Sequence, residues 1–284
     1  MCVTLVALSG CGGGKPGGTV SVVASTNVYA DIVRQIGGSQ VDVTSVLADP
    51  NADPHLFEPG TANGLAVAGA RLVVENGLDY DSFMTRLERA SPNGDRHVLT
   101  VADVLGVHGR DANPHLWYDV TALPRIAAAI EQQLVAVDPN GQDTYEQGLG
   151  AFIKSLAPLQ AAVASVAGKY RGAAVAYTEP VPAYLLRAAG LRNLAPSSFT
   201  RPIEQGTEPS AGAVSSMVAL VTKRRVRVLL YNEQAISPIT ARIRAAAQGA
   251  GVHVVAITET LPPGETFQQW QLAQVHALEE ALAG

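Results

Sequence analysis

Short apolar runs rich in β-branched residues alternate along the chain with stretches in which apolar residues recur at helical spacing. The apolar runs predict strands at 20–24, 41–47, 71–75, 97–101, 173–177, 226–231 and 252–257. The helical patterns predict helices at 28–36, 81–89, 121–137, 213–224, 239–249 and 267–282. Because strands alternate with helices, we expect an α/β fold whose mainly parallel sheets are covered by helices.

A long helical pattern from Asp143 to Lys169 separates the two groups of predicted strands. Its apolar residues keep helical spacing, and Pro158 within it predicts a kink. We therefore expect two α/β lobes, 19–140 and 171–284, joined by one long rigid helix at 141–170. Ligands of such proteins usually lie in the cleft between the lobes, near the carboxyl ends of the strands.

The first 18 residues differ from the rest of the chain. Residues 1–10 are mainly apolar and end in small residues, and the run LSGC at 8–11 resembles the bacterial lipobox, in which the cysteine is lipidated. The glycine-rich segment 12–18 is typical of a flexible tether. No later stretch suggests the roughly 20 apolar residues of a membrane span. We expect a lipid anchor on Cys11 that holds the protein at the outer face of the cell membrane.

Composition narrows the function classes. With 47% apolar and 16% charged residues the chain can bury a core, and its net charge of −5 gives no basic surface for nucleic acid. Both cysteines, Cys2 and Cys11, lie near the amino terminus, which excludes a disulfide or a thiolate metal site in the body of the protein. A metal would be held by His, Asp, Glu, Asn or water.

Four side chains are candidate metal ligands. Two of the six histidines, His55 and His115, each follow a proline that is preceded by Asp or Asn, and each belongs to a loop after a predicted strand. A lone loop histidine is usually only a polar surface residue, but here one local pattern occurs twice. Glu179 and Glu259 directly follow predicted strands of the second lobe, where a carboxylate points into the crevice above the sheet.

These four residues would form a cage across the two lobes. Imidazole and carboxylate ligands suit divalent ions such as Zn²⁺ and Mn²⁺, and two carboxylates neutralise the charge of the ion. We expect binding to weaken below about pH 6, where imidazoles become protonated.

The same stretches resemble a known family, the metal-binding lipoproteins that serve as solute-binding proteins of bacterial zinc and manganese ABC importers. The segments 53–59 (DPHLFEP) and 113–119 (NPHLWYD) match the motifs of the family's first two ligand histidines, and 23–29 resembles its opening strand. Tyr184 and the Gly-Leu pair at 190–191 place Glu179 at the third ligand position. Glu259 corresponds to the fourth, where the family commonly has Asp, and 232–234 resembles a polar cleft segment.

This resemblance implies a receptor that captures zinc or manganese outside the cell and delivers it to an ABC permease and its ATPase. It also implies a rigid link between the lobes, and we expect a monomer and no enzymatic activity. The choice between zinc and manganese stays open. The main alternative is a metal-dependent hydrolase in which Glu58 or Glu233 acts as general base. A surface interaction protein and a receptor for a chelated metal or an oxyanion have less support.

Overall fold

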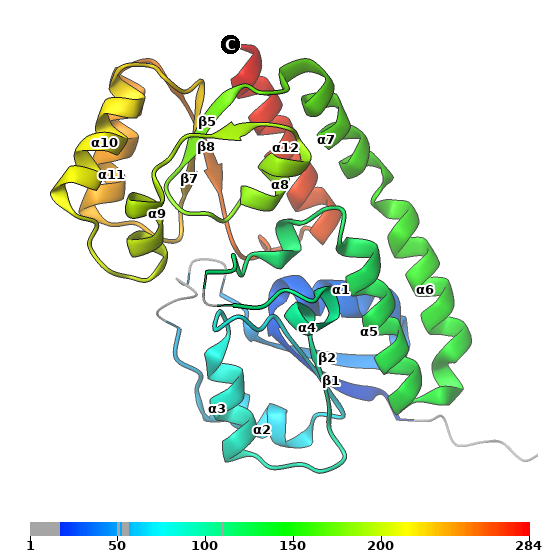
Figure 1. The fold of residues 1–284 in the computed structure, drawn as a ribbon. Helices are drawn as coiled ribbons and strands as arrows, with labels where there is room; N and C mark the ends of the chain where they lie inside the picture. Colours follow the sequence, from blue (N-terminus) through cyan, green and yellow to red (C-terminus); the bar gives the residue numbers. More distant parts are fainter. Residues whose placement is uncertain (1–17, 50–51, 53–56, 110) are drawn as a thin grey trace, which may run out of the picture.

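Two four-stranded parallel sheets form the framework of the protein (Figure 1). The computed structural model describes residues 18–49, 52, 57–109 and 111–284. The first sheet has the order β2-β1-β3-β4, with β1 (Val20–Thr26), β2 (Val41–Leu47), β3 (Leu72–Glu75) and β4 (His97–Thr100). The second has the order β6-β5-β7-β8, with β5 (Ala174–Tyr177), β6 (Arg192–Asn193), β7 (Val228–Asn232) and β8 (His253–Ile257). The predicted α/β fold with parallel sheets is confirmed.

Helices cover both sheets. Those of the first lobe are α1 (Asn27–Gly37), α2 (Thr61–Gly69), α3 (Ser82–Ala90), α4 (Val101–Leu105) and α5 (Leu123–Val137). Those of the second lobe are α8 (Ala183–Ala188), α9 (Ser197–Glu204), α10 (Ala211–Thr222), α11 (Pro238–Gly249) and α12 (Phe267–Ala283). The sequence patterns did not predict β6, α2, α4, α8 or α9. β6, α4 and α8 are too short to show a period, α2 has a weak one, and α9 contains Pro202, which normally argues against a helix.

The strands read as continuous apolar runs because both of their faces are buried. On β1 and β3, Val22 and Val74 belong to one cluster of buried side chains, whereas Val23 and Val73 face α2 and α3 in another. The first cluster continues without interruption from the first lobe into the second, where it includes Val228 and Phe267. The two lobes therefore share a common core on the side of the molecule where the chain crosses between them.

The predicted single linking helix is two helices. α6 (Gln142–Ser155) and α7 (Ala157–Tyr170) meet at Leu156 and run along one side of both lobes (Figure 1). Pro158 explains the break, because it has no N–H to donate to the carbonyl of Lys154 and its ring would clash with that carbonyl. The kink expected at this proline is thus a change of helix.

The linking segment is more apolar than the sequence analysis anticipated. By length and composition alone the helical run Pro139–Tyr170 could cross a membrane, although core helices share this property. Its side chains Phe152, Leu156 and Leu159 are at most 1% exposed and lie in the common core. These contacts assign the run a role in packing the two lobes together.

Polar contacts also tie α1 to the segment that leads into α12. The Asn27 side chain donates to the carbonyl of Leu261 at 2.8 Å and accepts the Leu261 N–H at 2.9 Å. Asp31 Oδ2 accepts the N–H of Phe267 at 2.9 Å. Two linking helices, a shared core and these hydrogen bonds therefore join the two lobes.

Candidate metal centre

Three of the four predicted ligands lie buried where the carboxyl ends of the second sheet meet the first lobe. Glu179 follows β5 and Glu259 follows β8, while His115 enters from the first lobe, directly before a turn of 3₁₀ helix at Leu116–Tyr118. Their exposed fractions are 1%, 0% and 0%. His55, the fourth predicted ligand, and Cys11 lie outside the described residues.

His115 and Glu259 are in direct contact, and an amide joins Glu259 to Glu179. The distance from His115 Nε2 to Glu259 Oε2 is 3.1 Å. Asn232 Nδ2, at the end of β7, donates to Glu259 Oε1 at 2.7 Å and also to Glu179 Oε2. The backbone N–H of Asn232 is in turn held by the Thr178 hydroxyl at 3.1 Å, which fixes β7 beside the end of β5.

Across the described part of the chain, no three His, Cys, Asp or Glu side chains are close enough to hold a metal ion as a group. The hydrogen bonds of Asn232 keep the two carboxylates on either side of one amide. Sequence reasoning placed 232–234 in the cleft, and the structure shows that Asn232 contacts both candidate carboxylates without itself being a predicted ligand.

The Asn-Pro-His turn orients the imidazole. Asn113 Oδ1 lies 3.0 Å from the backbone N of His115 and 2.7 Å from its ring Nδ1. A backbone N–H can only donate, so this atom is the amide oxygen and accepts both contacts. The ring Nδ1 therefore carries a hydrogen, and in a neutral imidazole the lone pair is on Nε2, which points toward Glu259.

Tyr80 is a residue of the centre that the sequence analysis did not single out. Its hydroxyl donates to Glu259 Oε2 at 3.1 Å. Burial raises the pKa of Tyr80 well above its usual value, and the charge of Glu259 raises it further. The loop before it passes through three residues of positive φ, Gly77 (82°), Leu78 (57°) and Asp79 (62°), a conformation that is rare for side chains such as Leu.

The side chain of Asp81 stabilises that loop. Its two carboxylate oxygens accept the N–H groups of Asn76 at 2.5 Å and Gly77 at 2.9 Å. Since this loop directly follows β3, the carboxyl end of the first sheet delivers Tyr80 to the same place as His115. No local sequence motif predicts that Tyr80 lies beside His115, because its position depends on the geometry of this turn.

Aromatic rings surround the imidazole. The ring centroid of Trp117 lies 5.4 Å from that of His115 and 4.8 Å from that of Tyr80. The ring centroids of Tyr80 and His115 are 5.7 Å apart. His115 and Trp117 are fully buried, and charges next to such apolar rings interact more strongly than they do in water.

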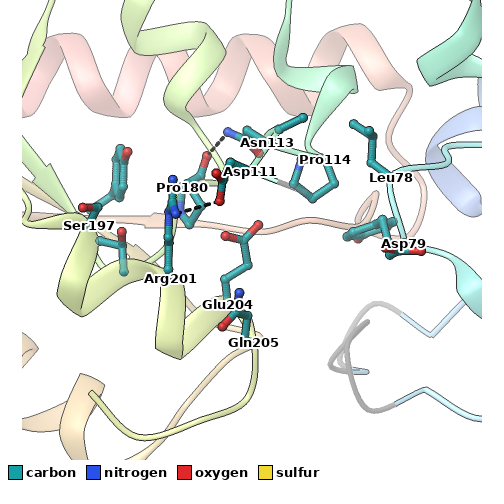
Figure 2. A pocket seen from close by; sticks show the side chains of 14 residues that line it. Leu78, Asp79, Asp111, Asn113, Pro114, Pro180, Ser197, Arg201, Glu204 and Gln205 are labelled. Atoms are coloured by element: carbon teal, nitrogen blue, oxygen red, sulfur yellow. Dashed lines mark hydrogen bonds and ion pairs between the residues drawn. The ribbon is translucent and has the colours of Figure 1, made fainter. Parts of the chain in front are cut away.

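A cavity of about 530 Å³ opens beside the centre and is lined by both lobes (Figure 2). Glu204 projects into it from α9, and its Oε1 lies 3.9 Å from His115 Nδ1. At the same cavity, Arg201 of the second lobe forms an ion pair with Asp111 of the first at 2.8 Å. Glu204 was missed in the sequence because α9 was not predicted.

Comparison with known proteins finds a matching family and several similar proteins. A family model for ZnuA, described as zinc-uptake complex component A, periplasmic, matches residues 22–281. The manganese ABC transporter substrate-binding lipoprotein PsaA of Streptococcus anginosus is 27% identical over 170 residues, which are 54% of this chain and 55% of that protein. The manganese-binding lipoprotein MntA of Halalkalibacterium halodurans is 28% identical over 167 residues, 56% of this chain and 55% of that protein. The chain thus spans about half the length of the curated relatives it matches.

Solved structures have the same fold. The crystal structure of ZnuA has a TM-score of 0.74 at 22% identity and covers 93% of this chain and 98% of its own. The protein FpvC of P. aeruginosa, in complex with Ni²⁺, has a TM-score of 0.78 at 19% identity, with 93% and 97% covered.

These relatives are binding components of transporters, in agreement with the expectation that this chain is not an enzyme. The family model covers most of the chain, residues 22–281. The chain belongs to the family of ZnuA, the periplasmic component A of the zinc-uptake complex.

Proposed function

We propose that this protein captures a divalent transition metal, zinc or manganese, outside the cell and delivers it to an ABC permease and its ATPase. The observation that carries the proposal is the buried contact of His115 Nε2 with Glu259 Oε2 at 3.1 Å. The fold and the relatives support it, since both belong to substrate-binding components of importers.

The chemistry of that contact favours a cation. With the hydrogen of His115 on Nδ1, the facing atoms Nε2 and Oε2 are both hydrogen-bond acceptors. Two buried acceptors attract each other only when a proton or a metal ion lies between them. A divalent metal satisfies both atoms at once, and it displaces any proton that bridges them in the metal-free protein.

We propose His55, His115, Glu179 and Glu259 as the ligands. Two carboxylates balance the charge of a dication in a buried site, which lowers the cost of removing the ion from water. His55 enters this set through its Asp-Pro-His motif alone. Imidazole with carboxylate suits both candidate ions, and in general Zn²⁺ binds such ligands more tightly than Mn²⁺.

The comparisons point to both metals. The family is named for zinc uptake, whereas the similar lipoproteins PsaA of Streptococcus anginosus and MntA of Halalkalibacterium halodurans are named for manganese. We propose that this chain, like the relatives named as lipoproteins, is lipid-anchored at the outer face of the membrane, through Cys11, and that it acts as a monomer.

Titration calorimetry on the chelator-stripped full chain tests the proposal. We expect one Zn²⁺ or one Mn²⁺ per chain, and at least ~30-fold weaker binding in each of the variants His55→Ala, His115→Ala and Glu179→Ala, because each removes a ligand from a buried ion. The control is His276→Ala, which changes an exposed histidine on α12. Absence of binding by the wild-type chain, or equal loss in the control, would overturn the proposed function.

A further inference from the structure

Both polar side-chain atoms of Asn113 and its carbonyl make hydrogen bonds, and together these bonds reach both lobes. Within the first lobe, its Oδ1 accepts the backbone and ring N–H groups of His115 at 3.0 and 2.7 Å. Toward the second lobe, its Nδ2 donates to the carbonyl of Pro180 at 2.7 Å, shown as a dashed line in Figure 2. Its own carbonyl accepts the hydroxyl of Tyr184 at 2.8 Å.

The orientation of this amide is fixed from two sides. The backbone N–H of His115 can only donate, and the carbonyl of Pro180 can only accept, so neither contact survives a rotation of the amide by 180°. The amide oxygen consequently holds the ring hydrogen on Nδ1. Without it, a neutral imidazole would divide between two tautomers, and in one of them the hydrogen would lie on Nε2, facing Glu259.

The contact with Pro180 reaches the residue directly after Glu179. One side chain therefore joins a candidate ligand of the first lobe to the turn that carries a candidate ligand of the second.

We propose that Asn113 is a positioning residue for metal capture. It selects the tautomer of His115 that presents a lone pair to the metal, and it holds the His115 turn in register with the Glu179-Pro180 turn across the cleft. This inference rests on the proposed function, because the consequence of positioning is metal affinity. Partners that orient a metal-binding histidine typically change metal affinity by about 10–100-fold when removed.

Two variants separate the two parts of this role. Asn113→Ala removes the acceptor of the ring hydrogen and the donor to Pro180. Asn113→Asp keeps an acceptor for both N–H groups of His115, but places a carboxylate oxygen against the carbonyl of Pro180. The matched control is Arg201→Gln, which breaks the ion pair with Asp111 across the same cleft and does not touch His115.

The experiment measures two quantities on the full chain. The first is the affinity for Zn²⁺, by competition with a chromophoric chelator. The second is the tautomer of the His115 ring in the metal-free protein at pH 8, from the ¹⁵N chemical shifts of histidine-labelled samples, with the resonances assigned by comparison with His115→Ala.

We expect the Nδ1–H form in wild type, in Asn113→Asp and in Arg201→Gln, and a mixture of tautomers in Asn113→Ala. We expect affinity to fall ~10–100-fold in Asn113→Ala, by a smaller factor in Asn113→Asp, and by less than about twofold in Arg201→Gln. Wild-type affinity in Asn113→Ala, or an unchanged tautomer in that variant, would refute the positioning role.

A wild-type chain that binds no metal would refute the proposed function instead. The ¹⁵N shifts of the metal-free protein would still test whether Asn113 sets the tautomer. The failure of one proposal is therefore distinguishable from the failure of the other.

Discussion

Changing Glu259 to Gln should make the metal-free protein more stable and at the same time weaken its hold on metal. In the wild-type protein, Glu259 Oε2 faces the lone pair of His115 Nε2, and Glu259 and Glu179 accept hydrogen bonds from the same amide of Asn232. A Gln side chain of the same shape keeps the oxygen that Asn232 contacts and turns an N–H donor toward His115. His115 Nε2 then gains a donor, whereas the Tyr80 hydroxyl, which donates to Glu259 Oε2 in the wild-type protein, loses that acceptor and has to rotate to accept the second amide hydrogen.

The size of the effect follows from the geometry. A new hydrogen bond to a buried acceptor contributes about 1 kcal/mol. Two oxygens bound to one amide nitrogen lie roughly 4–5 Å apart, and like charges at that distance repel by up to about 4 kcal/mol at an effective dielectric constant of 20. We expect a net gain of about 1–4 kcal/mol, which raises the melting temperature of the metal-free protein by about 3–12 °C. Loss of one charged ligand should weaken metal binding by about 2–5 kcal/mol, or roughly 30–4,000-fold.

Differential scanning calorimetry of the chelator-treated variant and wild type measures the first effect, and chelator competition measures the second. Glu208→Gln serves as the control, since it removes a carboxylate from an exposed position of the same lobe. The reasoning is refuted if the metal-free Glu259→Gln protein melts below the wild type, or if it retains wild-type affinity.

Three further predictions address the surroundings of the centre and the anchor. Burial, assisted by the charge of Asp81, raises the pKa of Glu75 from 4.5 to about 7. As the pH rises from 4.5 to 8, wild type should therefore lose about 3 kcal/mol more stability than Glu75→Gln, as denaturation of both proteins at the two pH values will show. Asn232→Ala removes the shared donor of two buried carboxylates and should lower the stability of the metal-free protein by about 1–3 kcal/mol. Adding Zn²⁺ should then raise the melting temperature of this variant by more than it raises that of wild type. Equal melting temperatures of the two metal-free proteins would contradict this. Cys11→Ala should move the protein from the membrane fraction to the soluble fraction on immunoblots, and unchanged fractionation would exclude Cys11 as the anchor.

The sequence predicts the framework well because burial of both faces makes parallel strands stand out as apolar runs. It also predicts that Glu179 and Glu259 lie close together, since both follow strands whose carboxyl ends meet at one edge of a sheet. The strand β6 escapes prediction because it has only two residues, Arg192 and Asn193, and is defined by its pairing with β5.

The rest of the centre depends on contacts between segments distant in sequence. Tyr80 reaches Glu259, 179 residues away, only after a loop of three residues with positive φ. Asn113 looks like an ordinary turn former, and its hydrogen bond with Pro180 becomes visible only when the lobes are placed together. Pro158 predicts a kink, but not that the helix stops and a new one begins.

The location of bound metal tests the central claim most directly. Crystals of the full chain grown with Zn²⁺ or with Mn²⁺ should be measured at the absorption edge of each ion. We predict one anomalous peak per chain, in contact with His115 Nε2 and with carboxylate oxygens of Glu179 and Glu259. A peak at another place on the molecule, with the contact between His115 and Glu259 unchanged, would contradict the account.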